Sequence, residues 1–242
     1  MPTHWYTGTV SRILVLSPGT RQFDLMVMGE DRTFDFIPGQ FITLDLPVSD
    51  KRRDRWRSYS IANEPNDKNL IELCIVRSPE GPGTRYLFEE IKTGSEITFK
   101  GPDGGFIIPG DLTKEIVMIC TGTGVAPFRS MIRHIMQNNM PFRSIHLIFG
   151  TRRQEDILYR EEFEQYAQEN PCFRYSVALS REDVKGFHHG YVHGIYMEEY
   201  SKNTPDRYFY ICGWSKMIDE AIENLILKSK YDKTQIRYEL YG

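Results

Sequence analysis

The segment Thr121-Gly122-Thr123-Gly124-Val125-Ala126-Pro127 carries the clearest chemical signal in the sequence. It follows the apolar run 116–120 and precedes a segment with amphipathic helical spacing, residues 128–137. Small residues at a strand-to-helix turn let backbone N–H groups approach a phosphate, and the following helix start carries a partial positive charge. The turn therefore predicts a site for a pyrophosphate-bearing nucleotide, although a tight turn alone also recruits glycine.

The cysteines and histidines do not have the spacing of a metal or redox site. The four cysteines, at positions 74, 120, 172 and 212, are widely separated, unlike those of a zinc site, a redox dithiol or an iron–sulfur loop. His188, His189 and His193 lack a carboxylate or cysteine at ligand spacing, and Gly190 between them indicates a loop. We expect no bound metal, and a polar loop near the adenine end of the nucleotide.

The elements that must position these residues fall into two patterns. Before about residue 105, short apolar runs of period two lie between turn residues, at 10–16, 23–27, 41–46, 57–62, 70–76 and 96–100, with one helix at 84–91. About six short strands predict a small antiparallel barrel or sandwich.

After Gly101-Pro102-Asp103-Gly104-Gly105, strands alternate with helices. The expected strands are 116–120, 145–149, 173–179, 208–212 and 236–240, and the expected helices are 128–137, 159–168 and 216–227. This alternation predicts a parallel sheet covered by helices, with ligands at the carboxyl ends of the strands. We therefore expect two domains, 1–105 and 106–242.

Composition narrows the function classes. Lys plus Arg total 30 against 33 for Asp plus Glu, which gives no reason to expect nucleic acid as a partner. No apolar stretch approaches the roughly 18 to 20 residues of a membrane span, and the N-terminus lacks a signal pattern. We expect a cytoplasmic protein without a membrane span.

A second motif resembles the signature of a known protein family. Arg57-Ser58-Tyr59-Ser60 resembles the flavin-binding signature of the ferredoxin–NADP⁺ reductase superfamily. The resemblance implies that Arg57 pairs with the FAD pyrophosphate, that Tyr59 packs on the isoalloxazine ring, and that Ser60 hydrogen-bonds near the hydride-accepting nitrogen. A guanidinium, a phenol and a hydroxyl suit these roles chemically. An ordinary strand is the alternative for this motif taken alone.

Companion motifs follow in the family's order. Gly81-Pro82-Gly83-Thr84 resembles the second FAD segment, where Thr84 could equally be a helix N-cap. Residues 101–106 resemble the family's Gly-Pro turn at the domain junction, and 121–127 resemble its pyridine-nucleotide motif. With this resemblance, FAD binding is also assigned to Cys74, Ile75 and Val76. It implies a single-chain FAD-binding NAD(P)H oxidoreductase without an iron–sulfur domain, with a six-stranded FAD barrel before an α/β nucleotide domain.

Further correspondences concern the nicotinamide. Cys212-Gly213 resembles the family's segment beside that ring, although a buried structural cysteine is the alternative. Glu239-Leu240-Tyr241 resembles the ending of plant-type reductases, where the aromatic ring shields the flavin and the Glu joins the proton network at the motif serine. Here Gly242 follows Tyr241, which leaves the shielding role open.

The adenosine end decides between NADPH and NADH. Ser180-Arg181, with Arg152, Arg153 and Lys185, supplies hydroxyl and cationic groups for a 2′-phosphate. Glu182 and Asp183 could accept a ribose diol instead. The cations favour NADP(H), and NAD(H) stays open.

These motifs predict an FAD-dependent reductase that takes hydride from NADPH and passes electrons singly to ferredoxin or flavodoxin, with Ser60, Cys212 and Glu239 at the transfer site. An acidic acceptor would dock near a basic run that includes Lys51, Arg52, Arg53 and Arg55, for which a solvated loop is the alternative when the run is taken alone. Two alternatives remain: an NAD(P)H:flavin or ferric reductase with small acceptors, and an FAD-holding relay subunit of a larger complex.

Overall fold

The computed structural model describes residues 4–29 and 33–241, with Tyr241 described in its backbone only. By its internal contacts the chain forms two compact units. The first comprises Met1–Ile108 with Ala126–Asn138, and the second comprises Pro109–Val125 with Asn139–Gly242. The helix that follows the nucleotide turn therefore belongs to the first unit, whereas the turn belongs to the second.

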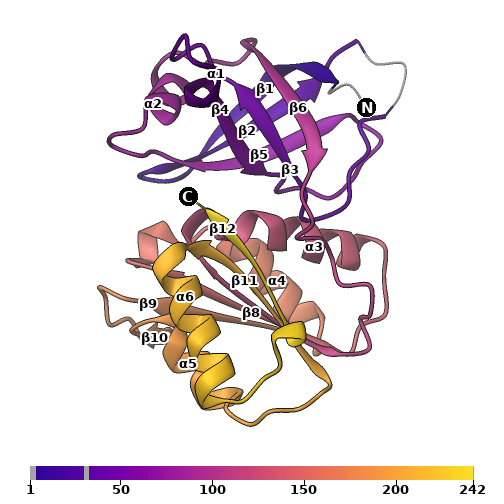
Figure 1. Cartoon of the computed structure of the whole chain (residues 1–242), viewed down its shortest axis with the longest axis vertical. Helices are drawn as coiled ribbons and strands as arrows, with labels where there is room; N and C mark the ends of the chain where they lie inside the picture. The colour runs from indigo at the N-terminus through magenta and orange to yellow at the C-terminus, as the bar shows by residue number, and fades with distance from the viewer. Residues whose placement is uncertain (1–3, 30–32, 242) are drawn as a thin grey trace. The chain divides into compact units, whose positions relative to one another are not determined.

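The first unit is built on six antiparallel strands, which Figure 1 shows in indigo to magenta. They are β1 (Trp5–Ser17), β2 (Thr20–Val27), β3 (Phe41–Asp45), β4 (Trp56–Ser60), β5 (Leu70–Val76) and β6 (Glu96–Asp103). The order is β4-β3-β6-β1-β2-β5, and a bridge between Ile61 and Leu73 joins the two end strands. The predicted six-stranded barrel is confirmed.

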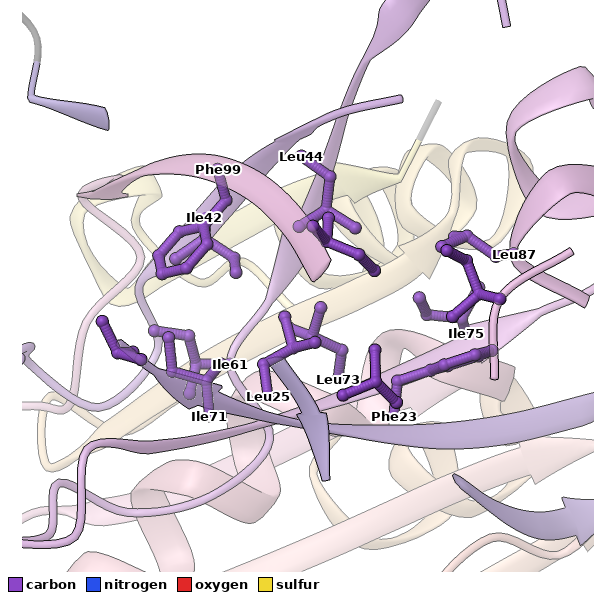
Figure 2. Packing of buried hydrophobic residues seen from close by; sticks show 14 of the residues in the cluster. Phe23, Leu25, Ile42, Leu44, Ile61, Ile71, Leu73, Ile75, Leu87 and Phe99 are labelled. Atoms are coloured by element: carbon purple, nitrogen blue, oxygen red, sulfur yellow. The ribbon is translucent and has the colours of Figure 1, made fainter. Parts of the chain in front are cut away.

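Period-two alternation fills the barrel. Leu25, Leu73 and Phe99, from three strands, are fully buried, and Figure 2 shows such side chains of several strands meeting in one cluster. Burying one side chain of this kind contributes about 1.5 to 3 kcal/mol. This core makes a rigid frame for β4, which carries the Arg57–Ser60 motif.

Two short helices join the barrel strands. The basic run forms α1 (Arg52–Arg55), which the sequence analysis did not predict. The other helix, α2 (Pro82–Glu89), begins two residues before the expected start, with Gly81 at its N-cap. Proline is pre-organised for the first helical position because its φ is fixed and its missing N–H is not needed there. The alternative that Thr84 is the N-cap of this helix is therefore wrong.

The second unit contains a parallel sheet, as predicted. Its strands are β7 (Glu115–Thr121), β8 (Ser144–Thr151), β9 (Phe173–Leu179), β10 (His188–His189), β11 (Arg207–Trp214) and β12 (Ile236–Tyr241). The order is β10-β9-β8-β7-β11-β12, and the strand pairs are parallel. The strands β8, β9 and β10 follow one another on one side of β7, and β11 and β12 lie on its other side. The strand order therefore switches beside β7, the strand that leads into the nucleotide turn. Ligands bind at such switch points in open α/β sheets.

Helical segments connect these strands. They are the 3-10 turns 122–124, 154–156 and 233–235, the helices α3 (Val125–Gln137), α4 (Arg160–Glu169), α5 (Val192–Glu199) and α6 (Ser215–Glu223), and a π turn at Asn224–Lys228. α3 begins three residues earlier than predicted, because Pro127 is tolerated within a first helical turn. Among the described residues, no helix has the length and hydropathy needed to cross a membrane.

The histidine segment is not the loop that we expected. His188 and His189 form β10, and His193 lies in α5. Gly194 lies inside α5 because a Cβ there would come within 2.5 Å of the His188 ring. A glycine inside the helix weakened its sequence signal, and this close packing explains why the helix was missed.

A histidine on β8 is buried in the second unit. His146 is 3% exposed; its Nδ1 lies 2.7 Å from the Tyr200 hydroxyl and its Nε2 2.8 Å from Ser176 Oγ. Burial, with a contribution from Arg174, lowers the pKa of His146 to about 3. Glu199 also lies 3.8 Å from Nδ1, but it is paired with Arg174.

We predict that His146 makes the fold acid-sensitive. Its ordinary pKa in an unfolded chain is about 6.5, so below that pH the unfolded state binds a proton that the folded state excludes. Stability should fall as pH drops, by about 2 kcal/mol between pH 7 and 5 from this residue alone. Urea unfolding at both pH values should show a smaller loss for His146→Gln than for the wild type. Equal losses would contradict the assignment.

Candidate functional site

Two of the predicted flavin segments lie against each other in the first unit. Arg57, on β4, packs over Gly83, in the first turn of α2: a Cβ on Gly83 would lie 3.1 Å from Arg57 Cγ and 3.3 Å from Nε. The guanidinium donates a hydrogen bond to the Trp56 carbonyl at 2.8 Å. A guanidinium beside the open N–H groups of a helix start suits a pyrophosphate.

Thr84 organises the loop before α2 rather than capping the helix. Its Oγ accepts a hydrogen bond from the Ser78 N–H at 3.0 Å and lies 3.2 Å from the carbonyl oxygens of Ser78 and Gly81. The hydroxyl therefore holds residues 78–81 in a closed turn. Gly81 and Pro82 are thereby placed at the helix start.

The remaining residues of the first motif alternate along β4. Tyr59 packs against the barrel core, and burial raises its pKa to about 12, with Arg57 acting in the opposite direction. It therefore stays a neutral phenol at physiological pH. Ser58 Oγ lies 3.0 Å from Thr43 Oγ1, and Ser60 is 4% exposed.

The third flavin segment can contribute mainly backbone. Cys74 and Ile75 are buried at the end of β5, and Val76 is exposed. The Ile75 side chain packs in the barrel core near Leu87 (Figure 2). Only its backbone groups are available to a ligand.

In the second unit, the nucleotide turn packs backbone to backbone on the end of β11. A Cβ on Gly124 would lie 2.4 Å from the Cys212 carbonyl oxygen, and one on Gly213 would lie 2.3 Å from Thr121 Oγ1. Gly122 and Gly213 also have positive φ values, +54° and +141°. The Trp214 N–H donates to Thr121 Oγ1 at 3.2 Å. The two predicted nucleotide segments are therefore one structure, and glycine is required on both sides.

Two of the three transfer-site candidates are strand neighbours. Cys212 is fully buried on β11 and pairs with Glu239 on β12 on one side and with Cys120 on β7 on the other. Burial raises the pKa of the neighbouring Cys120 thiol. The third candidate, Ser60, lies in the first unit. The side chain of Tyr241 and all of Gly242 lie outside the described residues.

The residues predicted for the adenosine end meet where β8 and β9 end. The Arg181 N–H donates to the Arg152 carbonyl at 3.0 Å, and Ser180 Oγ lies 3.3 Å from the Thr151 carbonyl. Glu182 accepts a hydrogen bond from the Gln154 N–H at 2.8 Å. A cavity of about 440 Å³ is lined here by Arg153, Gln154, Glu155, Arg160 and Glu182. Cations and a carboxylate thus share the region.

A buried polar cluster on α3 was not predicted from the sequence. Arg129, 5% exposed, donates to Glu72 at 2.5 Å and to the Ala62 carbonyl at 3.1 Å. Ser130 donates to the Asn63 carbonyl at 2.6 Å. Glu72 within the otherwise apolar strand 70–76 was the available signal, because a buried carboxylate requires a partner.

We predict that glycine at 124 is a steric requirement. In Gly124→Ala the new methyl group meets a backbone carbonyl that cannot rotate away, so unfolding should become easier by about 1 to 3 kcal/mol. Gly110→Ala is the matched control in the same unit, because a Cβ there meets nothing within 4 Å. Thermal unfolding should separate the two variants, and equal melting temperatures would contradict the close approach.

Comparisons with known proteins agree with the two-part site. Residues 7–108 match the family model described as oxidoreductase FAD-binding domain, and residues 118–223 match oxidoreductase NAD-binding domain. In solved structures, the chain is similar to the Amycolatopsis cytochrome P450 reductase GcoB, with a TM-score of 0.87 and 25% identity, covering 99% of this chain and 70% of that one.

Curated relatives support the same grouping. The phenol hydroxylase P5 protein of Acinetobacter pittii is 30% identical over 94% of this chain, which spans 63% of that relative's length. Ferredoxin–NADP reductase B of Sorangium cellulosum is 30% identical, and the match covers 84% of each chain. The chain therefore belongs to the ferredoxin–NADP⁺ reductase-like family of FAD- and NAD(P)-binding oxidoreductases.

Proposed function

We propose that the protein takes hydride from NADPH and passes electrons singly to a separate acceptor such as ferredoxin or flavodoxin. The observation that carries this proposal is that each unit contains one place where a glycine packs closely against its neighbours beside a helix start, as a dinucleotide cradle would need. One lies at Arg57 and Gly83, and the other lies at Gly124 and Gly213. A single nucleotide would need only one of them.

The first cradle fits FAD. Arg57 and the N–H groups at the start of α2 would bind the pyrophosphate, and the neutral Tyr59 phenol would present an aromatic face with a polar tip. Bound FAD supplies the chemistry of accepting two electrons together and releasing them one at a time. Ser60, Cys74, Ile75, Val76, Gly81, Pro82 and Thr84 complete the proposed site.

The second cradle fits the nicotinamide nucleotide. Thr121–Pro127 would bind its pyrophosphate at the start of α3, and Cys212 with Gly213 would border the ring. Glu239, beside Cys212 in register, would hold or move a proton near this site. These residues orient groups and exclude water rather than attack a substrate bond.

The nucleotide we propose is NADPH, with NADH as the alternative. Arg152, Arg153 and Arg181 lie on two neighbouring strand ends, where they could surround a 2′-phosphate. The nearby Glu182 carboxylate is already engaged with the Gln154 N–H, which limits its availability to a ribose diol.

We predict a measurable nucleotide preference. In stopped-flow reduction of the purified FAD-loaded protein, NADPH should bleach the flavin at least tenfold more efficiently than NADH. Arg181→Ala should remove most of that advantage and leave the NADH reaction within about twofold, because only the 2′-phosphate needs the cation. An equal or better reaction with NADH would overturn the NADPH proposal. FAD retention without bleaching by either nucleotide would favour the relay-subunit alternative.

The acceptor we propose is an acidic redox protein. Lys51, Arg52 and Arg53 are exposed, whereas Arg55 pairs with Asp45 at 2.7 Å and Arg57 packs over Gly83. The docking surface is therefore narrower than the sequence run. The similarity to a ferredoxin–NADP reductase supports a ferredoxin-like acceptor, and the four reduced cysteines support the cytoplasm as the proposed compartment.

We predict that electron delivery depends on these three cations. Reversing Lys51, Arg52 and Arg53 to Glu should slow reduction of an added ferredoxin or flavodoxin about tenfold at low salt, since steering fields accelerate encounter. NADPH oxidation by a small neutral dye should not change. Reversing the exposed Lys228, Lys230 and Lys233 in the second unit provides a control of equal charge. Equal salt sensitivity with dye and protein acceptor would favour small diffusible acceptors instead.

A further inference from the structure

The buried polar cluster on α3, formed by Arg129 and Ser130 with Glu72 of β5, is not part of either proposed cofactor site. Arg129 and Glu72 form an ion pair whose side chains are only 6% and 9% exposed. Desolvating two charges is costly, and apolar residues of similar size often stabilise a core equally well. A second pair, Arg133 with Glu64, joins the same helix to the same segment. α3 is thus attached to this segment by charged contacts rather than by apolar packing alone.

The segment that receives α3 directly continues the flavin motif. Ser60 is followed by Ile61, which bridges to Leu73, and by Ala62, whose N–H donates to the Glu72 carbonyl at 2.8 Å. The Ala62 carbonyl accepts from Arg129, so Ala62 is held on both sides. Only Ile61 stands between it and Ser60.

Asn63 locks the same segment to β5. Its Oδ1 accepts from the Glu72 N–H at 2.7 Å, and its Nδ2 donates to the Leu70 carbonyl at 2.9 Å. Its own carbonyl accepts from Ser130. Residues 61–63 therefore cannot shift without breaking contacts to both β5 and α3.

The other end of this connection is the nucleotide turn. α3 begins at Val125, directly after Gly124, and Arg129 lies five positions beyond that glycine. Arg129 therefore lies in the second turn of the helix into which the nucleotide turn leads.

Resting on the proposed function, we propose that Arg129 is a positioning residue for hydride transfer. With Glu72 and the Ala62 carbonyl, it holds α3, whose first residue directly follows the nucleotide turn, on the segment after Ser60. It is not among the residues proposed for either cofactor cradle. Its loss should therefore affect the reaction geometry rather than cofactor affinity, and a displacement of about 1 Å can cost about 100-fold in rate.

The test compares neutral double variants of the FAD-loaded protein. Arg129→Met with Glu72→Met removes both charges and leaves neither one buried alone. We expect the limiting rate of flavin bleaching at saturating NADPH to fall at least tenfold, while FAD content and the NADPH dissociation constant change less than about twofold. Arg129→Lys should recover part of the rate, because an ammonium can still meet Glu72.

The matched control is Arg207→Met with Glu115→Met. This Arg–Glu pair, 13% and 29% exposed, lies at the amino ends of β11 and β7, opposite the strand ends that carry the turn. Its loss should lower stability and leave the limiting rate unchanged.

Three results would overturn the proposal. The first is an unchanged limiting rate in the folded α3 variant, and the second is an equal fall in both double variants. If the α3 variant cannot hold FAD, the single variant Glu72→Gln replaces it, since glutamine keeps an oxygen for Arg129 and removes the charge. An unchanged limiting rate in Glu72→Gln is the third contradicting result. A wild-type protein that neither nucleotide bleaches would instead refute the proposed function and this inference with it.

Discussion

The nucleotide site depends on one close approach of two backbones. The turn after β7 and the end of β11 lie so near that neither Gly124 nor Gly213 has room for a Cβ. Parallel register places Cys212 between Cys120 and Glu239, so the same approach sets the side chains that border the turn. If the backbones separated, the N–H groups of the turn and the residues beside it would lose their common geometry.

In the barrel unit, a glycine and a small hydroxyl side chain determine the packing around Arg57. Gly83 leaves space for the arginine stem, and the Thr84 hydroxyl closes the loop before the helix. The barrel core fixes β4 beneath them. In both units, a strand carries the proposed functional side chain and a glycine lies close beside it, an arrangement that suits a phosphate.

The sequence predicted the parts of this structure whose signals are local. Period-two runs located the six barrel strands, and Gly-Thr-Gly-Val-Ala-Pro after an apolar strand located the nucleotide turn. Long-range packing was not predictable from these patterns. α5 was missed because it contains Gly194, which packs closely on His188. The alternative role of Thr84 as a helix cap was wrong because the helix begins earlier, with Gly81 at its N-cap. The partnership of Arg129 with Glu72 joins residues 57 positions apart, which no spacing rule reveals.

We propose that one chain binds both cofactors and moves hydride between them. The decisive experiment is an anaerobic equilibrium titration of the FAD-loaded protein with NADPH, with flavin absorbance and bound nucleotide recorded together. We expect complete bleaching by about one equivalent of nucleotide per FAD, because a hydride carries both electrons that the flavin accepts. Retention of the oxidised flavin spectrum at saturating NADPH and NADH would contradict it.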